Sequence, residues 1–82
     1  MFYVYVLKSL ASNRHYFGYT HNVDSRLKQH NKGNVLSTRN FRPWILLGFE
    51  VYQNRNEARW REHELKSHGE KRKEFIKALK PI

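Results

Sequence analysis

Two short runs that contain tyrosine, residues 3–5 and 16–18, lie close to the N-terminus, and Arg26 and His30 follow them. Phenol and imidazole groups can activate a water molecule. A guanidinium group can hold a phosphate and neutralise the charge that develops on it. A glycine at position 18 leaves a gap beside these side chains. This part of the chain therefore carries the groups that chemistry on a phosphate ester requires.

Tyr5 and Tyr16 are the phenols best placed for such chemistry. Each lies in a run of aromatic and β-branched residues, which is typical of a strand, and alternate side chains of a strand share a face. If the strands pair as a hairpin, the two phenols lie near each other beside Gly18, where a bulky group can approach the sheet closely. Either tyrosine considered alone is better explained as a half-buried residue of the sheet.

Arg26 and His30 are four residues apart on a predicted helix, so their side chains are neighbours. His30 also continues the stripe formed by Val23 and Leu27. The structural alternative is that Arg26 extends to solvent and His30 makes one internal hydrogen bond. That alternative explains either residue alone better than it explains both of them beside two tyrosines.

Glu62 is an anomaly on the next helix. Ala58, Glu62 and Leu65 follow the spacing i, i+4 and i+7, which places a carboxylate within an apolar stripe. Charged side chains are rarely buried without a partner. Glu62 therefore either pairs with an arginine or binds a cation. The tyrosines, Arg26 and His30 of the same chain favour the cation.

The scaffold for these side chains is predicted from periodicity and from the positions of glycine, proline and asparagine. Strands are expected over residues 2–7, 15–20 and 44–52, helices over 22–32, from Asn54 or Asn56 to about 67, and over 70–79, and a loop over 33–43. The order β-β-α-β-α-α predicts an α+β fold in which helices flank a three-stranded, mostly antiparallel sheet. We expect residues 1–82 to form a single domain.

The composition points to a polyanionic partner. Lys and Arg number 16 against 7 acidic residues, which gives a net charge of +9. The chain has no cysteine, which excludes disulfides and thiolate zinc sites. No apolar run is long enough to cross a membrane, and the first residues lack the pattern of a signal peptide. We therefore expect a cytoplasmic protein with no membrane partner.

Two basic segments are predicted to grip nucleic acid. The first segment, residues 37–42, mixes hydroxyl, guanidinium and aromatic groups, which suits phosphate contacts and stacking on an unpaired base. The second segment is the basic run at residues 71–73, which is explained equally well as the solvated end of a helix. Neither segment has a pattern that reads base sequence, so we expect selectivity for nucleic-acid structure. The predicted contacts are Gly18, Thr38, Arg39, Asn40, Phe41, Arg42, Lys71 and Lys73, with Lys77 and Lys80 as further members of the second segment.

Taken in order, these motifs resemble the GIY-YIG nuclease superfamily, and most closely its small members that consist of this domain alone. The motifs that carry the resemblance are Tyr3-Val4-Tyr5, Tyr16-Phe17-Gly18, Arg26, His30 and Glu62. They span nearly the whole chain. Tyr3 stands where the family name has its first glycine, and Phe17 replaces an isoleucine.

The resemblance implies a metal-dependent phosphodiesterase that cuts a nucleic-acid strand. We expect DNA in preference to RNA as that strand, although the sequence leaves the choice open. Tyr5 would help to activate the attacking water, and Tyr16 would position that water or the phosphate. Arg26 would hold the scissile phosphate, and His30 would join the tyrosine cluster or relay a proton. Glu62 would hold one metal ion, Mg²⁺ or Mn²⁺, because a single carboxylate suits one hydrated ion better than a two-metal clamp.

Two other functions remain open on the sequence alone. The net charge of +9 is equally compatible with a non-catalytic module that binds nucleic acid. The same basic surface could instead dock on an acidic protein partner, which would make the chain an accessory subunit.

Overall fold

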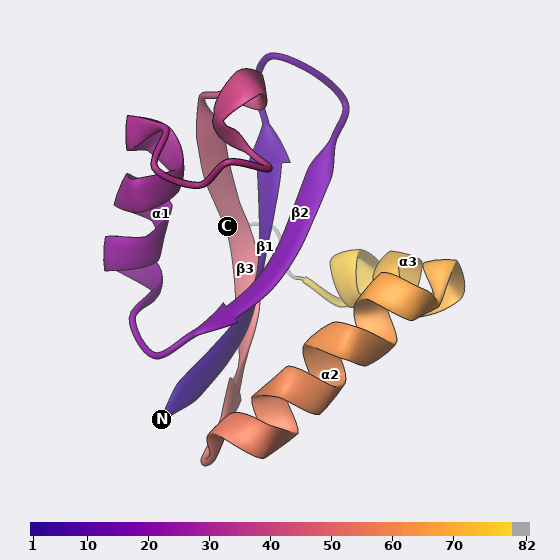
Figure 1. The fold of residues 1–82 in the computed structure, drawn as a ribbon. Coiled ribbons are helices and arrows are strands. Elements are labelled where there is room, and N and C mark those ends of the chain that lie inside the picture. Colours follow the sequence, from indigo (N-terminus) through magenta and orange to yellow (C-terminus); the bar gives the residue numbers. More distant parts are fainter. Residues whose placement is uncertain (80–82) are drawn as a thin grey trace.

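The computed structural model describes residues 1–79 and has the predicted α+β fold (Figure 1). The elements are β1 (Phe2–Ser9), β2 (His15–Thr20), α1 (Val23–Lys32), the 3-10 helix η1 (Arg39–Phe41), β3 (Trp44–Tyr52), α2 (Arg55–Ser67) and α3 (Gly69–Ala78). The predicted order β-β-α-β-α-α is confirmed. The sequence prediction missed η1, because it treated residues 33–43 as an irregular loop.

The sheet has the strand order β2-β1-β3, and β1 pairs antiparallel with both neighbours. Tyr5 lies opposite Gly18 on β2, so the hairpin has the register that the strand pattern predicted. The pairing of β1 with β3 shifts between Val6 and Leu7, which leaves one extra residue of β3 in a bulge. Because β1 is the central strand, β2 and β3 are the edge strands of this sheet.

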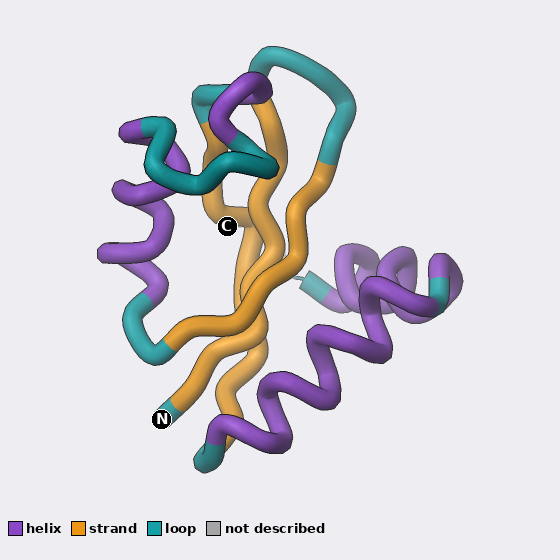
Figure 2. The backbone as a smooth tube through the Cα atoms, viewed as in Figure 1, coloured by secondary structure: helices purple, strands orange, loops and turns teal. Residues whose placement is uncertain are grey.

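Helices cover both faces of the sheet, because β1 is apolar on both of them. Val4 and Val6 face α2 and α3, where they pack in a cluster with Leu65 and Phe75. On the opposite face a second cluster centres on Tyr5 and lies under α1 and η1. Figures 1 and 2 show α1 and η1 on one side of the sheet and α2 with α3 on the other.

Side-chain caps fix where the helices begin and end. Asn22 caps α1 by accepting a hydrogen bond from the Ser25 amide at 3.0 Å, and Gly33 ends it with a positive φ of 84°. Of the two asparagines considered for α2, Asn54 is the cap, at 2.9 Å from the Glu57 amide. No helix among residues 1–79 is long and apolar enough to span a bilayer.

α2 is held to the sheet by charge as well as by packing. Arg61 donates from Nε to Glu50 of β3 at 2.9 Å and from Nη1 to Glu64 at 2.6 Å. At the end of α2, Arg72 of α3 donates to the carbonyls of Leu65 and Lys66, at 2.8 and 3.0 Å. These bonds set the position of α2, and hence of every side chain it presents to the sheet.

The segment between α1 and β3 is fastened at Trp44. The side chain of Asn31 donates to the Trp44 carbonyl at 3.0 Å and accepts from the Trp44 amide at 2.7 Å. The Trp44 indole donates to the carbonyl of Thr38 at 2.9 Å. Because Trp44 is 3 % exposed, these bonds satisfy groups that water does not reach.

Candidate active site

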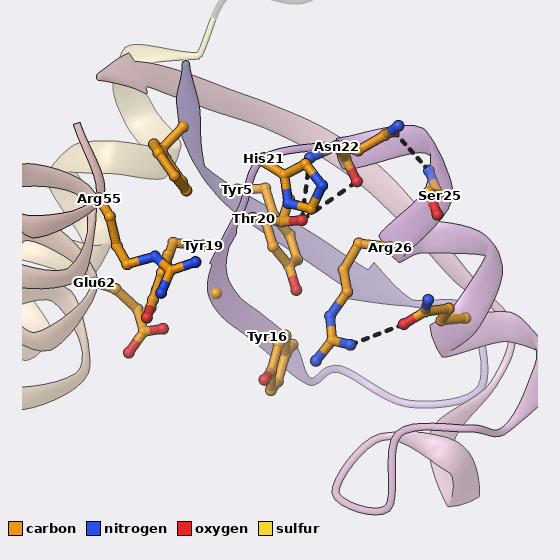
Figure 3. Close-up of a pocket in the computed structure, with 13 residues that line it drawn as sticks. Tyr5, Tyr16, Tyr19, Thr20, His21, Asn22, Ser25, Arg26, Arg55 and Glu62 are labelled. Carbon is orange, nitrogen blue, oxygen red and sulfur yellow. Dashed lines mark hydrogen bonds between the residues drawn. The ribbon is translucent and has the colours of Figure 1, made fainter. Parts of the chain in front are cut away.

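A cleft of about 580 Å³ opens between β2, the N-terminal half of α1 and the face of α2 that looks toward the sheet (Figure 3). It brings together Tyr5, Tyr16, Arg26 and Glu62, which are far apart in the sequence. The other lining residues are Phe2, Gly18, Tyr19, Thr20, His21, Asn22, Ser25, Gln29 and Arg55. Figure 3 shows the two phenols between Arg26 on one side and Glu62 on the other.

Gly18 positions Tyr5. A Cβ atom at residue 18 would lie 2.6 Å from the Tyr5 hydroxyl oxygen and 2.8 Å from its Cζ atom. The gap predicted beside Gly18 is therefore occupied by the Tyr5 ring, and any other bulky group must approach that ring rather than the backbone. Tyr5 itself is only 2 % exposed, so its ring is held firmly at the floor of the cleft.

A chain of hydrogen bonds leads from Tyr5 into the interior. The Tyr5 hydroxyl lies 2.9 Å from Nε2 of His30, and Nδ1 of His30 lies 2.8 Å from the hydroxyl oxygen of Thr38. Thr38 donates to the Val35 carbonyl at 3.4 Å, so it is free to accept the proton on Nδ1. This polarity assigns His30 the tautomer with Nε2 unprotonated, and Nε2 then accepts from Tyr5.

Burial sets the charge of both groups. His30 is fully buried, which lowers the pKa of His30 to about 4, and the nearby Arg26 guanidinium acts in the same direction. Burial raises the pKa of Tyr5 to about 12, although Arg26 opposes that rise. At neutral pH the pair therefore consists of a phenol that donates and a neutral imidazole that accepts.

Tyr16 lies beside this pair. Its ring centroid is 4.9 Å from that of His30 and 6.3 Å from that of Tyr5. The ammonium group of Lys66 lies 5.2 Å from the centre of the Tyr16 ring. Arg26 completes this side of the cleft and donates from Nη1 to Gln29 at 2.9 Å, which orients its guanidinium plane.

Glu62 faces these groups from α2. Its side chain is 20 % exposed, and the Lys66 ammonium lies 3.5 Å from its Oε1 atom. The arginine pairing considered for Glu62 is not formed, because this lysine one turn further along α2 takes the place of the arginine. Lys66 thus lies between the carboxylate and the Tyr16 ring.

The donor set suits one metal ion at most. Among residues 1–79, no group of three or more acidic, histidine or cysteine side chains could enclose an ion. A single carboxylate with phenol oxygens nearby fits Mg²⁺, which keeps most of its waters and shares its ligands with substrate phosphates. Glu62 is therefore the side chain of this set that could hold a hydrated divalent ion.

Most of the predicted nucleic-acid contacts lie outside the cleft. Thr38 is 1 % exposed and its hydroxyl is used by His30, so the prediction of a phosphate contact at Thr38 is wrong. Phe41 is half-buried against the Tyr5 cluster, with the Arg14 guanidinium 4.2 Å above its ring. The remaining residues outside the cleft are exposed: Arg39, Asn40, Arg42, Lys71 and Lys73. Lys80 lies outside the described residues.

Three residues in or beside the cleft were not predicted, although helical spacing indicates them. Arg55 precedes Glu62 by seven residues and Lys66 follows it by four, which places all three on one face of α2. Gln29 follows Arg26 by three residues and shares its face of α1. With Glu62 and Arg26 taken as site residues, helical spacing would have been enough to predict each of these neighbours.

Comparison with known proteins agrees with this geometry. Residues 1–75 match the sequence model of the GIY-YIG catalytic domain. A UPF0213 protein of Staphylococcus haemolyticus is 38 % identical over 72 residues, 87 % of each chain. A UPF0213 protein of Pediococcus pentosaceus is 40 % identical over 80 residues, which are 96 % of this chain and 81 % of the relative. The solution structure of a UPF0213 protein from Bacillus halodurans superposes with a TM-score of 0.57 at 34 % identity and covers 98 % of this chain and 86 % of its own.

Proposed function

The chain belongs to the family of GIY-YIG catalytic domains, and from this premise we propose that it is a metal-dependent nuclease that hydrolyses one strand of a nucleic acid. The observation that carries the proposal is the hydrogen-bonded chain from Tyr5 through His30 to Thr38, which begins at the floor of a cleft lined by Arg26 and Glu62.

In this proposal Tyr5 relays the proton of the attacking water to His30. Storing a phenolate with a pKa of about 12 would cost about 7 kcal/mol at pH 7. Charging an imidazole with a pKa of about 4 would cost about 4 kcal/mol. The cheaper route is therefore concerted: the phenol oxygen takes a proton from water while its own proton moves to Nε2 of His30.

The water oxygen forms the new bond to phosphorus, and the bond from phosphorus to the leaving sugar oxygen breaks. Arg26 would hold the non-bridging oxygens of the phosphate, and its own position is fixed by Gln29. A phosphate bound to Arg26 also offsets the positive charge that lowers the pKa of His30, which makes the imidazole a better base when substrate is present. Tyr16 would orient the water from the opposite side.

Glu62 is the residue that would hold the single ion, Mg²⁺ or Mn²⁺. When bound, such an ion supplies a Lewis acid that stabilises negative charge on the phosphate and on the leaving oxygen. Lys66 would then move away from the Glu62 carboxylate, which leaves its ammonium group free to face the phosphate backbone of the substrate. The proposal includes DNA in preference to RNA as substrate, and the cytoplasm as the place of action.

The test is cleavage of labelled single-stranded, duplex and flapped DNA and of matched RNA, with Mg²⁺, Mn²⁺ or a chelator. Tyr5→Phe removes only the relay oxygen and should lower the rate about 100-fold or more, and Glu62→Ala should act similarly. Tyr3→Phe on the same strand and Glu70→Ala on α3 are the matched controls, and both should cleave like the parent chain. Cleavage that survives the first two changes undiminished would refute the site.

The net charge of +9 also supports a second function, a module that binds nucleic acid without cutting it. It predicts binding that weakens steeply with salt, no cleavage under either metal, and little effect of Glu62→Ala on affinity. The same substrate panel separates the two functions.

A further inference from the structure

α2 carries an exposed tryptophan with no packing role in the fold. Trp60 is 69 % exposed, whereas Trp44 is 3 % exposed and hydrogen-bonded. The ring of His63 lies beside it, with centroids 5.9 Å apart and planes at 36°. Together the two rings border a shallow hollow of about 350 Å³ that Asn56 and Arg59 also line. An aromatic surface of this kind is suited to contact another flat ring.

The hollow and the cleft share no lining residue, but both lie on α2 and are related by the spacing of the helix. Successive residues of a helix are about 100° apart. Counted from Glu62, Arg59 therefore lies about 60° further round the helix, His63 about 100° and Trp60 about 160°. The path from the cleft to the two rings thus crosses Arg59 and runs nearly half-way round the helix, about 15 Å over its surface.

The charge along this path suits a polyanion. Arg55 lines the cleft and Arg59 lines the hollow, so one guanidinium group stands at the cleft end of the path and another stands part of the way along it. The other acidic residues of α2 lie beyond Trp60 on the same count, Glu64 at about 200° and Glu57 at about 220°. Glu57 interacts there with Asn54, and Glu64 with Arg61. A chain of phosphates can therefore cross this arc without meeting a carboxylate after Glu62.

We propose that the Trp60 and His63 rings form a platform on which an unpaired base of the substrate strand stacks, across α2 from the phosphate held in the cleft. Arg59 contacts the phosphate between the cleft and the platform. The inference rests on the proposed function and deepens it, because it names the substrate class: a strand that is single on the side of the cut that crosses α2. A base within a duplex has no free face to offer the two rings.

Binding in a chelating buffer tests the platform without any cleavage. Oligothymidine should quench the fluorescence of Trp60, which is exposed, and a blunt duplex of equal charge should quench it much less. Trp60→Ala should weaken single-strand binding about 5- to 100-fold, the range found when one stacked base loses its aromatic partner. Trp60→Phe should retain most of the affinity. Leu36→Ala, at a residue that is 74 % exposed, is the control and should change nothing.

Equal single-strand affinity of the parent chain and Trp60→Ala would overturn the platform, and so would quenching by the duplex as strong as that by oligothymidine. The two proposals fail separately. Quenching without any cleavage refutes the nuclease and leaves the platform standing. Cleavage of flapped and single-stranded DNA that is indifferent to Trp60→Ala refutes the platform alone.

Discussion

Acid should unfold this protein through one buried imidazole. The pKa of His30 falls from 6.5 to about 4 on folding, chiefly because the ring is buried. Between these values the unfolded chain binds a proton that the folded chain does not. The free energy of unfolding must therefore decrease as the pH falls through this window. Above pH 6.5 the imidazole is neutral in both states, and the full contribution to stability is present.

The magnitude follows from the shift. A change from 6.5 to about 4 corresponds to about 3 kcal/mol. Total stability for a domain of this size is about 4–12 kcal/mol, so one residue controls a large share of it. In a melting experiment each kcal/mol is worth about 4–8 °C in Tm. Arg61 lowers the pKa of the Glu64 carboxyl below its ordinary value of 4.5, so its contribution to stability starts to be lost only at the acid end of this window.

The assay is urea unfolding at several pH values between 7 and 4.5, followed by circular dichroism. His30→Gln cannot titrate, so this variant should be less stable than the parent chain at pH 7 yet nearly constant across the window. His15→Gln is the matched control, because partial burial and Lys8 also lower the pKa of this histidine, but it lies at the surface. This variant should keep most of the slope of the parent chain. A slope in His30→Gln as steep as in the parent chain would refute the reasoning.

Further predictions concern the positions that build the cleft. Gly18→Ala should destabilise the fold by about 1–3 kcal/mol and abolish cleavage, because the new methyl group meets the phenol at 2.6 Å; Gly69→Ala, with a nearest contact at 3.4 Å, should be harmless in the same unfolding assay. Asn31→Ala should cost about 2 kcal/mol in chemical unfolding, since it leaves a buried amide of β3 unpaired. Lys66→Met should lower the Mg²⁺ concentration for half-maximal cleavage, as the ammonium no longer competes for Glu62, and an unchanged requirement would argue against that competition.

The fold was predictable because local patterns agreed with one another. Strand alternation around Tyr5, the caps at Asn22 and Asn54 and the stop at Gly33 each placed an element within a residue or two of its observed bounds. The convergence of distant side chains on one cleft followed from the hairpin register and from helical spacing. Their catalytic roles stay predictions that the cleavage assays address.

What escaped prediction depends on contacts between distant residues. Thr38 lies in a polar, basic segment whose composition is typical of an exposed surface. Its burial is explained only by the 3-10 helix and by the hydrogen bond from the Trp44 indole. The clamp that Asn31 forms on β3 is likewise invisible to periodicity. The structural alternative gave His30 one internal hydrogen bond, but His30 makes two, because Thr38 reaches it from outside the helix.

Among the described residues, no strand pairs with the outer edge of β3, and Ile45, Phe49 and Val51 are 40–49 % exposed there. Such an edge invites neighbouring copies to join it at high concentration. The bulge breaks its regularity, and the surplus of 16 basic over 7 acidic residues makes copies repel one another. Added salt screens this repulsion between copies but does not weaken the pairing of exposed strand edges. Concentrated samples should therefore turn turbid as ionic strength rises, and a nucleic-acid ligand that masks the basic surface should have the same effect.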